Sequence, residues 1–426
     1  MTRRAAVPDR AIRDGVRTIL DDVHRRGSEA VREANDRFGG GLESGRLTIN
    51  RGELAAARNS LQPMVRSALD QAIANVRLFA ETQRPSNRVV EISPGISIER
   101  RWQPLERVGC YVPGGTAAYP SSLIMTVVPA QVAGVGSVVV ASPAGPGHRV
   151  NDVLLGAAGL LEVDLLLVAG GAQAIAALAF GLPDAGVPAV DRIVGPGNPW
   201  VTAAKIELAG EVGIDLPAGP SEGMVLADDS ADPRIVAADL ITQAEHGPDS
   251  PAILVTTSRA LADAIEVEVG RQLARAPRHE ILERALSDHG AIVLAPDLAS
   301  AVDFVNAYGP EHLSVNVEPL EATVAAIRNA GSLFVGRWAP ESAGDYATGA
   351  NHVLPTGGLA RSSGALAVEA YGKFIQVQRV SEQGLASIRT TIGTLAEAEG
   401  LDAHRQAVEV RFAEMGEGID RLEERR

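Results

Sequence analysis

Three short stretches in the second half of the chain combine imidazole, carboxylate and amide side chains in a way that suits catalysis. They lie at 243–246 (QAEH), 311–312 (EH) and 345–352 (DYATGANH). Imidazoles and carboxylates can move protons near neutral pH, and together with amide oxygens they can bind a divalent cation. We therefore expect the active site to be built from these three stretches.

The first stretch offers two groups to a metal ion. Gln243 and His246 are three residues apart at the expected end of a helix, so both side chains share one helix face. An amide oxygen and a neutral imidazole both suit a hard or borderline cation. The alternative is that His246 only caps the end of the helix. Spacing alone does not decide between the two interpretations.

The second and third stretches lie in expected loops. Glu311 and His312 follow Gly309-Pro310 and form a candidate general acid-base pair. Neighbours in sequence often point apart, so a surface turn is the alternative. Asp345 and His352 fall in a long irregular segment that is rich in glycine and polar residues. Long ordered loops in compact enzymes are usually functional, which favours a site here.

Three Gly-rich turns form a second group of candidates. They lie at 111–115 (YVPGG), 170–173 (GGAQ) and 195–198 (GPGN), and each follows an expected strand and opens an expected helix. Glycine lets backbone amides approach a phosphate, and a helix N-terminus favours an anion. None of the turns matches G-x-G-x-x-G or a P-loop, and tight turns need glycine anyway. Their recurrence favours a phosphate or dinucleotide crevice beyond the carboxyl ends of the strands.

The chain from residue 107 onward supplies a framework for these candidates, because expected strands and helices alternate strictly. Short apolar runs bounded by Gly and Pro predict buried parallel strands. The expected strands are 108–113, 137–143, 164–171, 191–197, 223–228, 252–258, 291–296, 313–317 and 332–336. The expected helices between them are 121–133, 151–162, 173–180, 199–210, 232–245, 259–275, 299–308 and 320–329.

The two series of strands predict an α/β protein with two doubly wound, incomplete Rossmann-like parallel-sheet domains. Helical patterns at 11–34 and 54–81 precede them, followed by a Pro-Gly hairpin at 89–100. A charged helical tail begins at residue 381. The expected division is one α/β domain from 1–106 plus 223–360, a second from 107–222, and a C-terminal segment at 361–426.

Composition restricts the class of protein. The formal net charge is −14, which argues against nucleic-acid binding, since that needs a basic face. Cys110 is the one cysteine, so we expect a buried residue in a strand rather than a disulfide or a catalytic thiol. The sequence lacks an apolar secretory core at its start and any run of about 18 apolar residues. A cytoplasmic enzyme without membrane contact is expected.

A series of longer blocks resembles the histidinol dehydrogenase family. The blocks follow one another in order over nearly the whole chain, and several are chemically unusual. They are RVGCYVPGG (107–115), GGAQAIAALAFG (170–181), GPGN (195–198), AGPSE (218–222), QAEHGPDS (243–250), PEHL (310–313), ESAGDY (341–346) and NHVLPT (351–356).

The resemblance implies an enzyme that catalyses the last two steps of histidine biosynthesis. L-histidinol would be oxidised by NAD to the aldehyde and then to L-histidine. One zinc ion per active site would hold the substrate without itself being oxidised or reduced. Carried over by position, the zinc ligands would be Gln243, His246, Asp345 and His404.

The resemblance also implies roles for the acid-base pair. His312 would take the proton of the alcohol, and Glu311 would activate the water that attacks the aldehyde. Ser221, His352 and Glu399 would contact the substrate, together with His312 and the four zinc ligands.

On the cofactor side, Tyr111, Gln173 and Asn198 would contact NAD, one on each Gly-rich turn.

The helical tail would cross to the partner subunit, which implies an obligate homodimer with shared active sites. The chain departs from the family in three places. Its N-terminal arm is shorter, and Ser28 stands where the family usually has Asp. The segment 360–366 lacks the aromatic residue or histidine that commonly follows its arginine. The shorter arm puts some dimer contacts in doubt.

Two other functions compete with this one. A paralogue on the same scaffold would keep zinc and NAD but oxidise another small alcohol, such as a sulfonated diol. A non-catalytic binding protein would be expected to lose Glu311-His312 or a zinc ligand. All of these residues are present, which favours the first interpretation.

Overall fold

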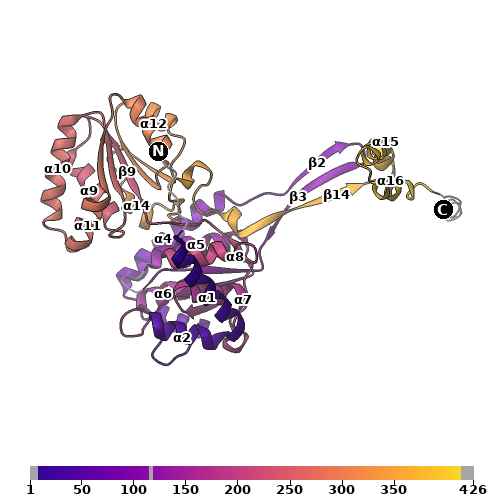
Figure 1. Ribbon diagram of the computed structural model, residues 1–426, viewed down its shortest axis with the longest axis horizontal. Coiled ribbons are helices and arrows are strands. Elements are labelled where there is room, and N and C mark those ends of the chain that lie inside the picture. The colour runs from indigo at the N-terminus through magenta and orange to yellow at the C-terminus, as the bar shows by residue number, and fades with distance from the viewer. Residues whose placement is uncertain (1–7, 115–118, 414–426) are drawn as a thin grey trace. The chain divides into compact units, whose positions relative to one another are not determined.

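The computed structural model describes residues 8–114 and 119–413. The chain forms two compact units, the first from Met1–Arg84 with Pro104–Tyr371 and the second from Pro85–Gln103 with Gly372–Arg426. The first unit holds two separate sheets with helices packed around them (Figure 1). The predicted α/β architecture with two parallel sheets is confirmed.

The first sheet has the strand order β1-β6-β5-β4-β7-β8, and every neighbouring pair is parallel except β1 with β6. Its strands are β1 (Thr48–Asn50), β4 (Arg107–Tyr111), β5 (Ser137–Ser142), β6 (Leu165–Val168), β7 (Arg192–Val194) and β8 (Gly213–Ile214). The chain adds β5 and β6 on one side of β4 and then returns to its other side with β7. The order therefore reverses between β4 and β7, which is where open α/β sheets bind ligands.

Within the described residues, seven helices pack around this sheet and include those predicted between its strands. They are α1 (Arg10–Arg26), α2 (Ser28–Phe38), α3 (Arg51–Asn59), α5 (Pro120–Ala133), α6 (Asp152–Leu160), α7 (Gly171–Phe180) and α8 (Pro199–Leu208), with α4 (Pro63–Thr82) beside α5. Val16 and Leu20 of α1 share a buried core with Ile175 of α7 and Val201 of α8. The first helices thus belong with the sheet of 107–222, which differs from their expected grouping with 223–360.

The second sheet has the order β11-β10-β9-β12-β13 and is parallel throughout. Its strands are β9 (Gly223–Ala227), β10 (Ala252–Thr256), β11 (Gly290–Leu294), β12 (His312–Asn316) and β13 (Ser332–Val335). Its helices are α9 (Pro233–Ala244), α10 (Arg259–Leu273), α11 (His279–His289), α12 (Leu298–Tyr308), α13 (Leu320–Ala326) and α14 (Glu341–Tyr346). Helix α11 was not predicted, and α14 lies in the segment that was expected to be irregular.

The second unit contains a three-stranded sheet and two helices. The predicted hairpin is formed by β2 (Arg88–Ser93) and β3 (Ile96–Pro104), and Gly95 in its turn has a φ of 82°, as a tight turn requires. β14 (Gly372–Val380) pairs with β3 and ends just before the expected start of the helical tail at residue 381. The helices α15 (Glu382–Ala398) and α16 (Asp402–Glu409) follow.

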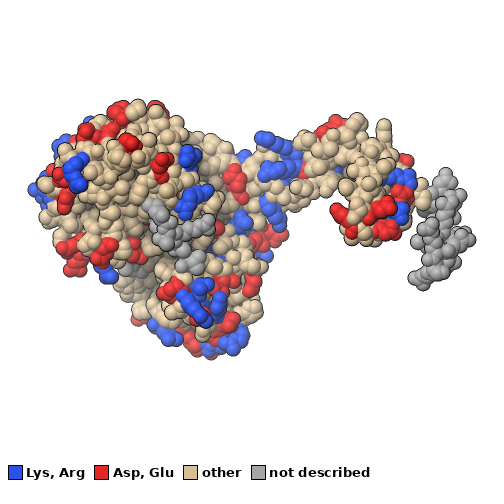
Figure 2. All heavy atoms as spheres, turned by 45° about the horizontal axis from the view of Figure 1, so that its top comes forward, with Lys and Arg blue, Asp and Glu red and all other residues tan. Residues whose placement is uncertain are grey.

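The distribution of surface charge and the apolar character of the helices relate to the partners expected from the sequence, which include neither nucleic acid nor a membrane. On the face drawn in Figure 2, acidic and basic side chains are interspersed in both units. Among the described residues, no helix combines the length and the apolar character that a membrane span requires.

Candidate active site

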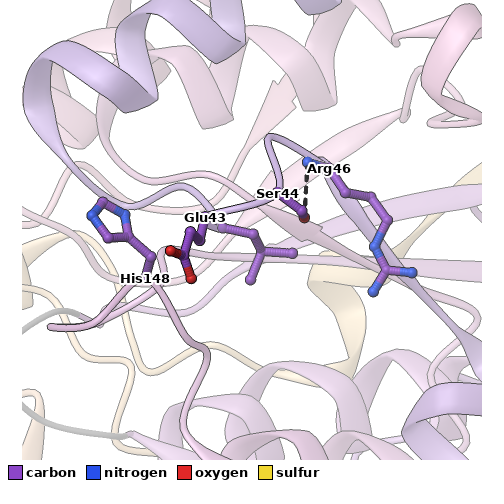
Figure 3. A pocket seen from close by; sticks show the side chains of 5 residues that line it. Glu43, Ser44, Arg46 and His148 are labelled. Atoms are coloured by element: carbon purple, nitrogen blue, oxygen red, sulfur yellow. Dashed lines mark hydrogen bonds between the residues drawn. The ribbon is translucent and has the colours of Figure 1, made fainter.

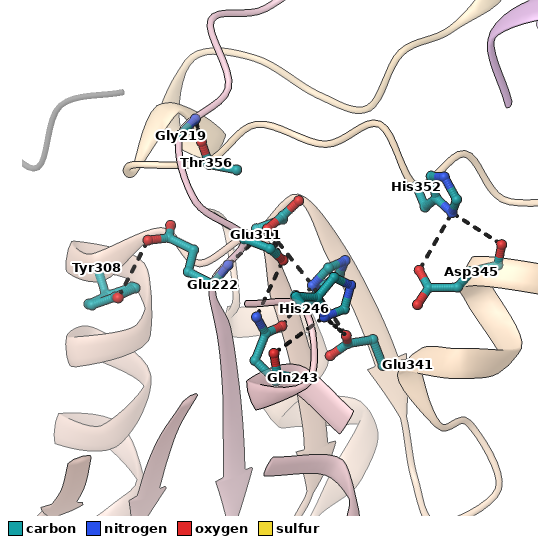
Figure 4. A network of polar contacts seen from close by, with 12 residues as sticks. Gly219, Glu222, Gln243, His246, Tyr308, Glu311, Glu341, Asp345, His352 and Thr356 are labelled. Carbon is teal, nitrogen blue, oxygen red and sulfur yellow. Dashed lines mark hydrogen bonds and ion pairs between the residues drawn. The ribbon is translucent and has the colours of Figure 1, made fainter. Parts of the chain in front are cut away.

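The predicted imidazole and carboxylate stretches meet at one edge of the second sheet (Figure 4). Gln243 lies at the end of α9 with His246 just beyond it, while His312 begins β12 and pairs with Gly223 at the start of β9. Helix α14 and the loop after it approach the same edge. The cluster therefore lies at the amino ends of the strands. The expectation that ligands gather beyond the carboxyl ends does not hold for this part of the molecule.

Glu311 is buried and accepts two hydrogen bonds through the same oxygen. The hydroxyl of Ser221 donates to its Oε2 at 2.8 Å, and the backbone N–H of Glu222 donates at 2.9 Å. Burial raises the pKa of Glu311 to about 8, although both hydrogen bonds oppose the shift. A carboxyl group with a pKa near neutrality can gain and lose a proton at working pH, as general acid-base chemistry needs.

His312 is buried beside it and has two different ring nitrogens. Its Nδ1 lies 3.0 Å from Oε1 of Gln243, whereas its Nε2 is buried and has no hydrogen-bond partner among the described residues. Burial, with smaller effects from His246 and His352, holds the pKa of His312 well below its usual range. The imidazole is therefore neutral and keeps an unshared electron pair for a proton.

Glu341 joins this cluster, although the sequence analysis assigned it no role. The side chains of His246, Glu341 and Asp345 each offer a ligand atom, and these atoms all lie within 4.8 Å of one another. Burial raises the pKa of Glu341 well above its usual range, with a further contribution from Asp345. Glu341 and Asp345 are four residues apart on α14, a spacing that places both side chains on one face of the helix.

His352 connects the two halves of the first unit. Its Nδ1 lies 3.1 Å from the backbone oxygen of Asp345 and 3.6 Å from Oδ1 of the same residue. Its Nε2 lies 3.5 Å from the hydroxyl of Ser122, in the first turn of α5. Because α5 opens just after the first Gly-rich turn, this contact joins the side-chain cluster of the second sheet to the first sheet.

The three residues expected to contact NAD lie at the carboxyl edge of the first sheet. Tyr111 ends β4, and its hydroxyl accepts from the backbone N–H of Gly171 at 3.3 Å. Gln173 is buried in α7 and lies 3.4 Å from Asn35. Asn198 caps α8, and its Oδ1 accepts from the N–H groups of the next turn. Tyr111 and Gln173 are almost fully buried, whereas Asn198 is exposed.

A buried ion pair that sequence reasoning missed holds the third Gly-rich turn. Gly195 has a φ of 113°, and its N–H donates to Oδ2 of Asp215 at 2.7 Å. Lys205 forms an ion pair with the same carboxylate and donates to the oxygen of Gly195 at 3.0 Å. The N–H and the carbonyl oxygen of Gly195 are thereby both hydrogen-bonded, which restrains the turn.

The remaining predicted residues lie elsewhere. Glu399 and His404 are exposed in the second unit, His404 within α16. Cys110 is fully buried in β4, and burial raises its pKa to about 12, so the expectation of an inert thiol is confirmed. A pocket beside the loop that follows β5 is lined by Glu43, Arg46, His148 and two neighbours, and contains none of the predicted site residues (Figure 3).

Comparisons with known proteins cover almost the entire chain. The family model described as histidinol dehydrogenase matches residues 2–412. A histidinol dehydrogenase of Leifsonia xyli subsp. xyli is 47% identical over 399 residues, covering 93% of this chain and 91% of the relative. One of Haloarcula marismortui is 46% identical over 415 residues, covering 96% and 97%.

A solved structure agrees with these sequence relatives. The crystal structure of a histidinol dehydrogenase from Elizabethkingia anophelis superposes with a TM-score of 0.89 at 36% identity, covering 96% of this chain and 94% of that one. Sequence and fold therefore point to the same set of proteins.

Proposed function

Since the chain belongs to the histidinol dehydrogenase family and is thus an NAD-dependent oxidoreductase, we propose that it oxidises L-histidinol in two NAD-linked steps. The first step forms L-histidinaldehyde, and the second adds water and forms L-histidine, completing histidine biosynthesis. The observation that carries the proposal is the buried pair of Glu311 and His312, in which one group has a raised pKa and the other a lowered pKa.

The donor atoms at the cluster fit a zinc ion. Gln243, His246 and Asp345 supply amide oxygen, imidazole nitrogen and carboxylate oxygen, which are ligands that zinc accepts. The Nε2 of His312 and Oε1 of Glu341 are buried there without hydrogen-bond partners among the described residues. Bound zinc would supply a Lewis acid that holds the substrate through its nitrogen atoms, and bound NAD would supply the hydride acceptor.

The protein's own groups then divide the proton chemistry. His312 accepts the proton of the substrate hydroxyl at Nε2, because Nδ1 faces Gln243. Glu311 accepts a proton from the water that attacks the aldehyde carbon, and its oxygen is already oriented by Ser221 and Glu222. Ser221 and His352 lie beside this pair and contact the substrate.

The nucleotide fits the first sheet at the reversal between β4 and β7. The N-termini of α5, α7 and α8 follow the three Gly-rich turns at this edge and favour a pyrophosphate. Tyr111, Gln173 and Asn198 position these turns, and we propose that they contact NAD at this edge. The hydrogen bonds of Gly195 to Asp215 and Lys205 support this arrangement.

We further place His404 and Glu399 in the active site of a partner subunit, as the fourth zinc ligand and a substrate contact. Both are exposed in the second unit, which is consistent with such an exchange. The enzyme would then be a cytoplasmic homodimer with shared active sites and one zinc ion per subunit.

Turnover of L-histidinol tests the proposal. The zinc-loaded full chain is mixed with L-histidinol and excess NAD, and NADH and L-histidine are both measured. Two NADH per histidine are expected. No NADH would refute the proposal, and NADH formation only with a sulfonated diol would identify a paralogue with another substrate.

A further inference from the structure

We propose that Lys205 and Asp215 are positioning residues for NAD, because their buried ion pair holds the Gly195 turn in the conformation that binds the dinucleotide. This inference rests on the proposed function, in which that turn lies against NAD. It deepens the proposal by assigning two residues that set the affinity for the cofactor without touching it.

The conformation of the turn is the first argument. Gly195 follows β7 with a φ of 113°, a value that residues with a side chain rarely adopt. A Cβ at this position would also collide with the backbone oxygen of Tyr111, at the end of β4. Asn198 opens α8 directly after the turn. Because Tyr111 and Asn198 are both proposed to contact NAD, the position of Gly195 affects two cofactor contacts at once.

The hydrogen bonds of the ion pair are the second argument. The N–H of Gly195 donates to Oδ2 of Asp215 at 2.7 Å, and its carbonyl oxygen accepts from Nζ of Lys205 at 3.0 Å. Nζ also pairs with Asp215 and donates to the oxygen of Leu216 at 3.2 Å. An ammonium group has three protons, so these three partners use all of its donors. The pair therefore ties the turn to the segment that follows β8.

The burial of the two charges is the third argument. The side chains of Lys205 and Asp215 are each 2% exposed. With its donors used and almost no accessible surface, Lys205 is not placed to bind a pyrophosphate. Asp215 is equally shielded from a ribose hydroxyl. Both residues can act on NAD only through the backbone that they hold.

Stability alone does not account for this ion pair. Two buried charges lose much of their attraction to the cost of removing them from water, and neutral residues of similar volume often give an equally stable protein. The specific contribution of Lys205 and Asp215 is the geometry that they impose on Gly195. Neutral replacements should therefore restore stability without restoring that geometry.

NAD binding by the zinc-loaded full-length chain tests the inference without turnover. Wild type, K205M, D215N and K205M/D215N are titrated in a calorimeter with NAD and, separately, with L-histidinol. Urea unfolding of the same proteins gives their midpoints. R17M/E207Q is the matched control, because Arg17 and Glu207 form another ion pair of α8 and neither belongs to the turn.

K205M removes the donor to Gly195 and leaves Asp215 buried without its counter-charge. A displacement of about 1 Å in a positioning element can cost about 10²-fold, so the dissociation constant for NAD should rise at least about tenfold. The urea midpoint should fall as well. D215N still offers an oxygen to the N–H of Gly195, so its NAD affinity should fall less than that of K205M. The control should match wild type, and L-histidinol affinity should be unchanged in every variant.

The double variant separates positioning from a structural role. K205M/D215N leaves no charge unpaired, so its midpoint should return toward that of wild type, while its NAD affinity should stay at least about tenfold lower. It also carries the test should K205M not fold. Wild-type NAD affinity in the double variant would overturn the inference, and so would an equal loss of L-histidinol affinity. Wild type that binds NAD but leaves L-histidinol unoxidised would refute the proposed function alone.

Discussion

Oε1 of Gln243 lies 3.0 Å from Nδ1 of His312. A carbonyl oxygen only accepts hydrogen bonds, so Nδ1 carries the ring proton and Nε2 carries the electron pair. That nitrogen is buried and unpartnered among the described residues. One amide contact thus decides which ring nitrogen can act as the base.

Replacing His312 with Asn should remove the base and spare the metal. General base catalysis contributes about 10²- to 10⁴-fold, so kcat for alcohol oxidation should fall within that range. Zinc content should stay at the wild-type level, measured by atomic emission on the same samples. His289→Asn, at an exposed position on α11, is the control. A proportional loss of zinc in His312→Asn would mean that His312 is a ligand instead.

Replacing Glu311 with Gln should separate the two oxidations. The amide oxygen can still accept from Ser221 and Glu222, but the group can no longer take a proton from water. Oxidation of supplied L-histidinaldehyde should fall by about 10² or more, with a smaller loss for the alcohol step. Stopped-flow measurement of NADH from each substrate checks this. Equal losses in both steps would contradict the assigned role.

The raised pKa of Glu311 should make the metal-free protein lose stability as the pH rises. Below about 8 the folded protein keeps this carboxyl protonated, whereas the unfolded chain releases the proton in the ordinary glutamate range. The unfolded state therefore binds fewer protons, and the free energy of unfolding declines with pH until about 8.

Urea unfolding of metal-free wild type and Glu311→Gln between about pH 5 and pH 9 measures this effect. The stability of wild type minus that of the variant should fall with pH and level off above about 8. Taking the difference removes contributions common to both proteins, including that of His312. A difference that rises with pH would show that Glu311 is stabilised in its charged form.

His246→Asn should reduce the zinc content of the purified enzyme, because an imidazole is replaced by a weaker amide donor. Zinc per chain and chelator competition measure the loss. His279→Asn, at an exposed histidine paired with Glu283, should retain full zinc. Full zinc retention in His246→Asn would remove this residue from the ligand set.

The sequence predicted the alternation of strands and helices well, because buried parallel strands are short apolar runs with clear boundaries. Helix α11 was missed, although Leu282 and Ala285 are buried on one face and three residues apart. The grouping of α1 with the first sheet could not be predicted. Amphipathic spacing shows that Val16 and Leu20 are buried, but not which core receives them.

The composition of the candidate site was largely predictable, but its geometry was not. The short blocks around Gln243, Glu311 and Asp345 identified three segments that the fold brings together. Their place at the amino ends of the strands depends on how α9 and α14 pack, which local sequence does not encode. Glu341 was not predicted as a site residue, because a single carboxylate within a sequence block gives no sign of its role until its burial is known.

Gly223 should be essential for the position of Gln243. A Cβ added at residue 223 would lie 2.5 Å from Oε1 and 2.6 Å from Cγ of Gln243. Because both residues are buried between β9 and α9, the side chain of Gln243 has to move if Gly223→Ala is made. It would then lose its contact with His312 and its place beside the proposed metal.

Zinc affinity and kcat of Gly223→Ala should therefore both fall, each at least about tenfold, measured by chelator competition and NADH formation. Overpacking costs about 1–3 kcal/mol, so urea unfolding should show a folded, moderately destabilised protein. Gly270→Ala is the matched control, because a Cβ at this position in α10 would meet no atom within 4 Å. It should leave activity unchanged and raise stability by about 0.5–1 kcal/mol. Wild-type zinc affinity and rate in Gly223→Ala would show that neither metal binding nor proton transfer depends on where Gln243 lies.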